Sequence, residues 1–582
     1  MLRRAVLLSV ILANVSLLAL APAGSTAQTN AQFAPVPPVA NPCPRFKAGS
    51  VVTNPPALFS SNGALHVRFS YQQTTDAAGR LLHCFMTPDG LEDPTLHVKP
   101  GDALSITVTN NTPASPLGEM FNPPNCGDDT VEFTPPANSA ASIGSSVNIH
   151  YHGTNVTPQC HGDNVTKTLI NSGSTFQYSF TFPNDEPPGL YWYHPHVHGL
   201  AERDLLGGAT GALVVDGIQN VQPAVSGLRQ RLIVIRDQTQ LQSLAEGPGN
   251  CGVDVPFQDI SVNYVPIDSH QSSSGNVTFT PAVLRMNGGE TQFWRVTNST
   301  ADTVLDLQVI YDGVPQTLRI VGIDAVPVNS QDGSVTGELV PVTRFRLPTA
   351  SRVEFLVRAP APSVRVAQLI TNNINNGPQG DCDPTRPVFN IVLAGNPGAD
   401  GGADDKVPLT TTLSNTHQRF GGMGSESLST TRTFQFSEVQ PTQFFITQVG
   451  AGQQPTVFDN NNPPSVVTTQ GAVEKWIIQN IAQENHEFHM HQIHFKVLSQ
   501  DNFEVNGNQQ APAINGQFLD MIEVPFWDNV ANPNGPVPQV QLLMDFRGMD
   551  IGDFVYHCHI LSHEDLGMMA IIRVNPRPDG GR

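Results

Sequence analysis

The sequence predicts an all-β protein made of several related domains, and three observations support this class. Gly and Pro each account for 49 of the 582 residues, and only 14% of the residues are charged. The apolar runs are short and rich in Val, Ile, Phe and Thr, which favour strands. The chain is also too long for one hydrophobic core. We therefore expect three or four turn-rich antiparallel β domains.

A weak repeat divides the chain into three parts. Each copy is a Gly turn followed by an alternating strand that ends at Asn. The copies occupy residues 101–110, 289–298 and 471–480. The candidate joints are 216–230 and 395–408, and the second is too rich in Gly, Asp and Pro to form a core. We predict a signal peptide at 1–27 and domains at 28–218, 219–400 and 401–582.

The N-terminal segment has the features of a secretory signal. Arg3 and Arg4 precede an apolar run that extends to about Ala21, and small residues up to Ala27 form a cleavage site. An ordinary export signal and a twin-arginine signal both fit this pattern. We therefore expect a mature chain that begins near Gln28 and is periplasmic or extracellular. No later segment of the sequence is apolar for long enough to predict a membrane span.

The charge of the chain limits its partners. The sequence has 30 Lys and Arg against 50 Asp and Glu, which gives a formal net charge of −20 at pH 7. This balance argues against nucleic acid or an anionic membrane as a partner. It favours a soluble protein that attracts cations.

The cysteine count is odd. In an oxidising compartment, seven cysteines leave one unpaired, and on chemical grounds that one is Cys558. Sequence locality favours three disulfides among the other six: Cys43 with Cys84, Cys126 with Cys160, and Cys251 with Cys382. A metal-ligating role for Cys160, beside His161, is the less favoured alternative, because a small exported thiol is more often oxidised.

The tripeptide His557-Cys558-His559 predicts two adjoining metal sites. Side chains in a strand alternate between two faces, so both histidines point to one side and Cys558 points to the other. A thiolate, imidazoles and a weak Met ligand make up a blue-copper electron-transfer centre. Met568 follows in the sequence and can supply the Met ligand.

Three further His-x-His pairs occur in two matching contexts. They are His150 with His152, His194 with His196, and His489 with His491, the last preceded by His486. After the first and third copies of the repeat, a His pair, a strand and a second His pair follow in the same order. The second copy has strands, for example at 351–358, but its domain has one histidine, His270. We therefore expect metal in the first and third domains, with the second as a spacer or wall.

The type and number of these ligands favour copper over other metals. A zinc site needs three or four ligands, far fewer than the ten histidines, counting His563, and one cysteine gathered here. Iron and manganese sites bring carboxylate ligands, and none is interleaved with these motifs. Imidazole clusters with a separate Cys, His and Met site suit copper best.

As a set, these motifs resemble the four copper motifs of the multicopper oxidases, and nearly all of the mature chain resembles a three-domain laccase. The resemblance implies three cupredoxin-like Greek-key domains and four copper ions. By position, it implies type 1 copper at His486, Cys558, His563 and Met568, type 2 copper at His150 and His489, and a type 3 pair at His152, His194, His196, His491, His557 and His559.

The resemblance also implies catalytic roles beyond the ligands. Electrons from the substrate enter at Cys558 and pass to the histidines on the opposite face of its strand. Glu564 and Asp163 resemble acidic residues that deliver protons for dioxygen reduction in laccases. The loop 154–161 departs from the family pattern and weakens the alignment at Asp163. For His161, His198 and His494, we expect supporting roles near the ligands or structural roles.

These features predict an exported oxidase of phenols and aromatic amines that uses dioxygen. The alternative enzyme is a metallo-oxidase that acts on cuprous, ferrous or manganous ions. The scarcity of Met-rich segments favours organic substrates. A copper carrier without turnover is a third hypothesis, and the complete cluster ligand set argues against it. A two-domain copper nitrite reductase would not need eight cluster histidines.

Overall fold

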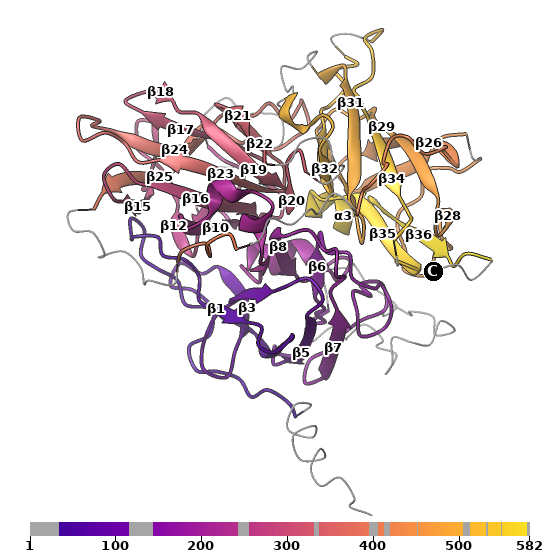
Figure 1. Ribbon diagram of the computed structural model, residues 1–582, viewed down its shortest axis with the longest axis horizontal. Helices are drawn as coiled ribbons and strands as arrows, with labels where there is room; N and C mark the ends of the chain where they lie inside the picture. Colours follow the sequence, from indigo (N-terminus) through magenta and orange to yellow (C-terminus); the bar gives the residue numbers. More distant parts are fainter. Residues whose placement is uncertain are drawn as a thin grey trace, which may run out of the picture. The chain divides into compact units, whose positions relative to one another are not determined.

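The protein is built almost entirely from β-strands, which confirms the predicted class (Figure 1). The computed structural model describes residues 34–115, 144–241, 255–330, 337–394, 405–411, 419–450, 452–503, 512–530, 533–548 and 550–578. The predicted signal peptide lies outside these residues. Two short α-helices in the described chain are α2 (Ala201–Leu206) and α3 (Leu561–Asp565). None of the described helices has the length and apolar character that crossing a membrane requires.

The strands β1 to β9 form the first group, with two sheets of order β3-β2-β5-β7 and β1-β4-β9-β8-β6. Their bounds are β1 (Ala57–Phe59), β2 (Ala64–Thr75), β3 (Leu81–Met86), β4 (Thr95–Val98), β5 (Ala103–Asn110), β6 (His150–His152), β7 (Thr175–Thr181), β8 (Gly189–His194) and β9 (Gly211–Val215).

The strands β10 to β25 form the second group, whose two large sheets contain the paths β12-β11-β10-β16-β23-β19-β20 and β15-β25-β24-β17-β18. Their bounds are β10 (Arg229–Gln238), β11 (Asp259–Val262), β12 (Val265–Ile267), β13 (Ser269–Gln271), β14 (Val277–Phe279), β15 (Ala282–Met286), β16 (Thr291–Asn298), β17 (Leu305–Tyr311), β18 (Val314–Pro315), β19 (Leu318–Ile323), β20 (Val326–Pro327), β21 (Val340–Val342), β22 (Phe345–Leu347), β23 (Arg352–Arg358), β24 (Ala367–Thr371) and β25 (Arg386–Leu393).

The strands β26 to β36 form the third group, with sheets of order β27-β26-β29-β34-β31-β32 and β28-β36-β35-β30-β33. Their bounds are β26 (Thr430–Val439), β27 (Gln443–Gln448), β28 (Val466–Thr469), β29 (Val473–Asn480), β30 (His486–Met490), β31 (Phe495–Asp501), β32 (Phe518–Leu519), β33 (Met521–Val524), β34 (Gln539–Asp545), β35 (Gly552–Cys558) and β36 (Met569–Asn575).

The three copies of the sequence repeat form β5, β16 and β29, which occupy equivalent places in the three groups. Each pairs in parallel with an earlier strand, β2, β10 or β26, and antiparallel with a later strand, β7, β23 or β34. The repeat therefore reflects one topology used three times. The predicted domain boundaries remain predictions.

The Asn that ends each repeat has a structural role. The side-chain amides of Asn110, Asn298 and Asn480 are buried and donate hydrogen bonds of 2.7–3.0 Å to carbonyls of neighbouring loops and strand ends. Buried polar groups must find such partners because unpaired ones destabilise the fold. In the second group, Asn298 holds the carbonyls of Leu347 and Pro348, directly ahead of the loop that enters β23.

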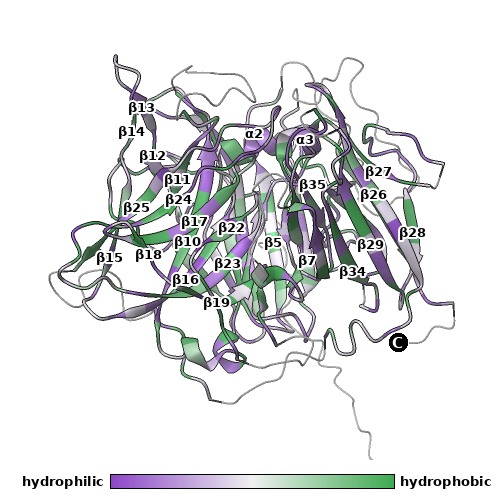
Figure 2. Cartoon of the chain, turned by 90° about the horizontal axis from the view of Figure 1, so that it is seen from above, coloured by the Kyte–Doolittle hydropathy of each residue, from purple (hydrophilic) through white to green (hydrophobic). Residues whose placement is uncertain are grey.

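Alternation along the strands places the core between the sheets. Figure 2 shows hydrophobic and hydrophilic residues alternating on the strands. In β29, Trp476 and Ile478 are fully buried while Ile477 between them is half-buried. This period of two is typical of a strand with one face on the core.

The first predicted disulfide is confirmed. Cys43 and Cys84 are bonded, with their Cα atoms 5.6 Å apart. Cys160 and Cys382 each take part in a disulfide as well. This excludes Cys160 as a thiolate metal ligand. Their predicted partners, Cys126 and Cys251, lie outside the described residues, so these two pairings stay predictions. Cys558 is free and buried, as expected.

Candidate metal centre

Two equivalent strand pairs carry most of the predicted metal ligands. In the first group, β6 pairs with β8 and sets His150 opposite His194. In the third group, β30 pairs with β35 and sets His489 opposite His557. Paired residues on one sheet face lie about 5 Å apart, so each ladder gathers histidines from distant segments.

Eight histidines from the two groups form one buried cluster. They are His150, His152, His194, His196, His489, His491, His557 and His559, each at most 1% exposed. The rings of His150 and His491 stack at 3.8 Å between centroids, and those of His152 and His489 stack at 4.0 Å. The cluster is therefore shared between the first and third groups, as the matching motifs predicted.

The outer ring nitrogens of this cluster are held by hydrogen bonds. They pair as follows: His150 Nδ1 with the Asp163 carboxylate at 2.8 Å, His152 Nε2 with the Asp520 carboxylate at 3.2 Å, His489 Nδ1 with the Asp520 carbonyl at 2.8 Å, His194 Nδ1 with the Pro195 carbonyl at 2.8 Å, and His557 Nδ1 with the Cys558 carbonyl at 2.7 Å. Such bonds fix the tautomer, so that the opposite nitrogen presents a lone pair.

Several of the opposite nitrogens have no hydrogen-bond partner in the described part of the chain. These are His150 Nε2, His152 Nδ1, His194 Nε2, His489 Nε2 and His559 Nε2. The Nε2 atom of His557 lies 3.2 Å from Nε2 of both His196 and His491. Metal–nitrogen bonds of about 2.0–2.1 Å place two ligands of one ion roughly 3–3.5 Å apart. The cluster therefore fits metal ions.

The protonation of the cluster also suits a metal. Burial lowers the pKa of His150, His152 and His489 well below the ordinary histidine value, and it lowers the pKa of His557 to about 3. Neutral imidazole is the form that binds a metal. The carboxylates that contact these rings do so at the outer ring nitrogens. The nitrogens that remain for a metal are therefore all imidazole, a donor set that favours copper over iron or manganese.

A second site lies on the other face of β35. The Nδ1 atoms of His486 and His563 are 3.1 Å apart, and each lies 3.8 Å from Sγ of Cys558. The Glu487 amide donates to Sγ at 3.3 Å. Burial raises the pKa of the Cys558 thiol well above its ordinary value, so a thiolate here requires a cation. Three soft and borderline donors meeting at one point match a blue-copper ligand set.

Met568 lies beside this second site. Its side chain is fully buried in the core that contains Cys558, and its carbonyl accepts the Cys558 amide at 3.0 Å. Its assignment as a weak fourth ligand stays a prediction.

The two predicted acidic residues are both buried. Asp163 accepts hydrogen bonds from His150 and from the Tyr151 amide, so the unusual loop 154–161 does not displace it. Burial raises the pKa of Asp163 to about 7 and that of Glu564 to about 8. Glu564 lies 3.4 Å from Nδ1 of His198.

The other two noted histidines differ in position. His161 pairs with the Gln177 carbonyl at 2.6 Å and stacks on Phe176, so its contacts are structural. His494 pairs with the Asp324 carbonyl at 3.0 Å and lies 3.6 Å from the Asp520 carboxylate. It therefore supports the cluster through Asp520.

Residues of the second group complete the surroundings of the cluster. Arg352 forms a bidentate ion pair with Asp520, which contacts His152. The Oγ1 atom of Thr349 lies 2.6 Å from the carbonyl oxygen of His559. The expectation that this part serves only as a spacer or wall is therefore too narrow. No motif marked Asp520, Arg352 or Thr349, because their partners lie far away in the sequence.

Carboxyl groups also cover the outer side of the Cys558 site. Glu438 lies 3.4 Å from Nε2 of His486, and Glu484 lies 3.3 Å from Nε2 of His563. Burial, together with the neighbouring Glu438, raises the pKa of Glu484 to about 11. No sequence motif marks this pair, although Glu484 lies close to His486 in the chain.

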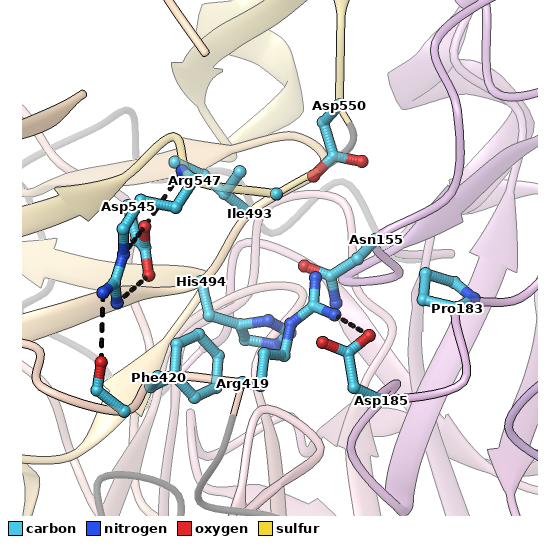
Figure 3. A pocket seen from close by; sticks show the side chains of 12 residues that line it. Asn155, Pro183, Asp185, Arg419, Phe420, Ile493, His494, Asp545, Arg547 and Asp550 are labelled. Carbon is cyan, nitrogen blue, oxygen red and sulfur yellow. Dashed lines mark hydrogen bonds and ion pairs between the residues drawn. The ribbon is translucent and has the colours of Figure 1, made fainter. Parts of the chain in front are cut away.

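A cavity of about 330 Å³ lies between the first and third groups (Figure 3). Its lining includes Asn155 and Arg419, with Arg419 paired to Asp185 at 2.8 Å. Arg547 and His494 line it from the third group. Since His494 also contacts Asp520, the cavity reaches the residues that surround the cluster.

Known proteins resemble this chain along most of its length. Family models described as multicopper oxidase match residues 137–220 and 427–578. The multicopper oxidase LPR1 homolog 1 of Oryza sativa subsp. japonica is 23% identical over 540 residues, covering 83% of this chain and 82% of the relative. A laccase of Bacillus subtilis is 21% identical, covering 86% of this chain and 93% of the laccase.

Solved structures share the fold. The McoA multicopper oxidase of Aquifex aeolicus has a TM-score of 0.62 at 18% identity, covering 91% of this chain and 100% of McoA. A Campylobacter jejuni multicopper oxidase described as a metallo-oxidase has a TM-score of 0.60 at 20% identity, covering 94% and 100% of the two chains. With both histidine-bearing parts matched by the family models, the chain belongs to the multicopper oxidases, oxidoreductases whose cofactor is copper.

Proposed function

We propose that this protein is an exported, laccase-like oxidase of phenols and aromatic amines. The observation that carries the proposal is the position of Cys558. Its Sγ faces His486 and His563, while its carbonyl accepts Nδ1 of His557 from the histidine cluster. Cys558 thus connects a site that would accept one electron at a time with a histidine cluster that has enough ligands to hold the metal ions needed for dioxygen reduction.

We assign the ligand sets by their positions in the family's copper motifs. His486, Cys558, His563 and Met568 would hold type 1 copper, His150 and His489 type 2 copper, and His152, His194, His196, His491, His557 and His559 a type 3 pair. When bound, copper supplies a one-electron acceptor beside Cys558 and the electrons that reduce dioxygen at the cluster. Four one-electron oxidations and four protons then convert one dioxygen to two water molecules.

The side chains around the cluster orient the ligands and supply protons. Asp163 and Asp520 fix the outer nitrogens of His150 and His152. We assign proton delivery to Asp163 and Glu564, which are both buried. Export is supported by the Cys43–Cys84 disulfide, because such bonds persist in oxidising compartments.

A second candidate function is oxidation of metal ions. It is favoured by Glu438 and Glu484, whose carboxyl groups meet the outer nitrogens of His486 and His563. A cation held between them would lie next to the electron-entry ligands. An organic substrate would instead contact Leu566, which is 39% exposed and directly follows the last residue of α3.

Dioxygen uptake by the copper-loaded protein tests these functions. We expect uptake with a methoxyphenol, and uptake only with cuprous, ferrous or manganous ions would establish the second function instead. No uptake with any reductant would refute both.

The double variant Glu438→Gln/Glu484→Gln separates the substrate classes. If cations bind there, it slows their oxidation and leaves phenol oxidation in place. Glu426→Gln, which alters a partly exposed carboxylate paired with Arg547, is the matched control. A redox titration of each variant distinguishes lost cation binding from a changed potential.

A further inference from the structure

The hydroxyl of Thr349, a residue of the second group of strands, contacts residues at both proposed metal sites. Thr349 is fully buried on the loop between β22 and β23. Its Oγ1 hydrogen-bonds to a carboxyl oxygen of Glu487 and lies 2.6 Å from the His559 carbonyl. Its amide donates to the other Glu487 oxygen at 3.0 Å. Thr349 therefore ties Glu487 to His559.

Glu487 in turn acts on the sulfur of Cys558 through its backbone. It directly follows His486, and its amide donates to Sγ at 3.3 Å, while its carbonyl accepts the His559 amide at 3.0 Å. The peptide is thus held at its amide, its carbonyl and its side chain. A shift of the Glu487 side chain would change the hydrogen bond that the sulfur receives.

The loop that carries Thr349 is itself firmly held. The amide of Ala350 donates to the Asn298 carbonyl at 2.7 Å, and the Asn298 side chain holds the carbonyls of Leu347 and Pro348 at 3.0 Å. Beyond the loop, Arg352 is anchored on Asp520. Thr349 is thereby fixed from both sides, as a residue that positions others must be.

We propose that Thr349 is a positioning residue that tunes the reduction potential of the Cys558 site. The inference rests on the proposed function, because the tuned site is the proposed type 1 copper site. Hydrogen bonding around the cysteine sulfur is one of the factors that set the potential of a blue-copper centre. The hydrogen bond from the Glu487 amide stabilises the reduced copper site more than the oxidised one, because the sulfur carries more negative charge in the reduced site. Loosening the Glu487 amide therefore lowers the potential.

The test compares copper-loaded Thr349→Val with the wild-type protein. Valine keeps the shape and removes the hydroxyl, so we expect a lower potential in redox titration and a shift of the thiolate-to-copper absorption band. Thr349→Ser restores the hydroxyl and should restore both values. Thr371→Val is the matched control, because Thr371, on β24, is buried in the same group and accepts a hydrogen bond from the Asp306 amide on β17. It should match the wild type.

A second variant checks that Glu487 carries the effect. Glu487→Ala should shift the potential in the same direction, and adding Thr349→Val to it should cause no further shift, since both remove the same contact. If Thr349→Val does not retain copper, Glu487→Ala alone decides the test. An unchanged potential and band in these variants would overturn the inference. A wild-type protein without a blue band would overturn the proposed function instead.

Discussion

The side chain of Cys558 is fully buried and accepts the Glu487 amide, while its carbonyl accepts Nδ1 of His557 at 2.7 Å. This residue therefore touches both proposed sites through different atoms. The sulfur lies on one face of β35, and the neighbouring histidines lie on the other because strand side chains alternate.

Replacing Cys558 with Ser should remove the intense visible absorption and stop turnover. A hydroxyl does not supply the thiolate on which a blue-copper centre depends, so the electron-entry site is lost. Visible spectroscopy and dioxygen uptake provide the measurement, and copper analysis should still find metal at the histidine cluster. A blue and active variant would refute the assignment of Cys558.

Met568 allows a test of the fourth ligand. Replacing it with Leu conserves volume in a buried position and should cost under about 1.5 kcal/mol of stability. If the thioether is a weak ligand, its loss disfavours copper(II) relative to copper(I), so the potential should rise. A redox titration of the blue band is the measurement, and an unchanged potential would show that Met568 only fills the core.

At the scale of the elements, the segment from β22 to the start of β23 connects all three strand groups. Arg352 at the start of β23 donates to the Leu190 carbonyl in the first group and pairs with Asp520 in the third. Gly153, with φ +80°, follows His152 at this point, and a Cβ there would collide with Arg352 and Asp520. The Gly after His152 is therefore required by the close approach of this ion pair.

Replacing Arg352 with Met should destabilise the protein strongly. The change leaves Asp520 buried without its main charged partner, and breaking a buried pair in this way costs about 3–5 kcal/mol. Calorimetric melting should show a clear fall in Tm. As a control, Arg573→Met removes a pair with Asp553 in which the arginine is 49% exposed, and it should cost about 0–1 kcal/mol. Equal effects of the two substitutions would contradict this account.

For the whole molecule, the cluster acts as a joint between the first and third groups. Its histidines come from β6, β8 and the turn after β8 on one side, and from β30, β35 and the residues just after these strands on the other, with rings of the two groups stacked at 3.8 and 4.0 Å. A metal ion bound by histidines of both groups therefore resists their separation.

Removing copper should accordingly lower Tm. A ligand that binds only the folded state stabilises it by about 2.7 kcal/mol at a free concentration of 100 times its Kd. Melting curves of the chelator-treated and the reconstituted protein test this. Cys558→Ser serves as the comparison, because it should keep part of the copper-dependent rise through the intact cluster. Identical curves with and without copper would contradict a metal joint between the groups.

Much of this protein could be predicted from the sequence because the relevant signals are local. Strand alternation and turn residues predicted the β class, and the repeat marked β5, β16 and β29. The histidines and cysteine of the candidate sites were recognisable because each motif lies on one strand or on the turn next to it. Sequence locality also identified the Cys43–Cys84 disulfide.

The partners of those motifs were decided by the tertiary structure alone. Asp520 meets His152 across 368 residues, and Thr349 meets His559 across 210. An Asp, a Thr or an Arg far from the histidine motifs has no spacing that marks it, and only the packing of the three strand groups brings it to the cluster. Local chemistry thus determined which residues can bind metal, whereas long-range packing determined which side chains orient them.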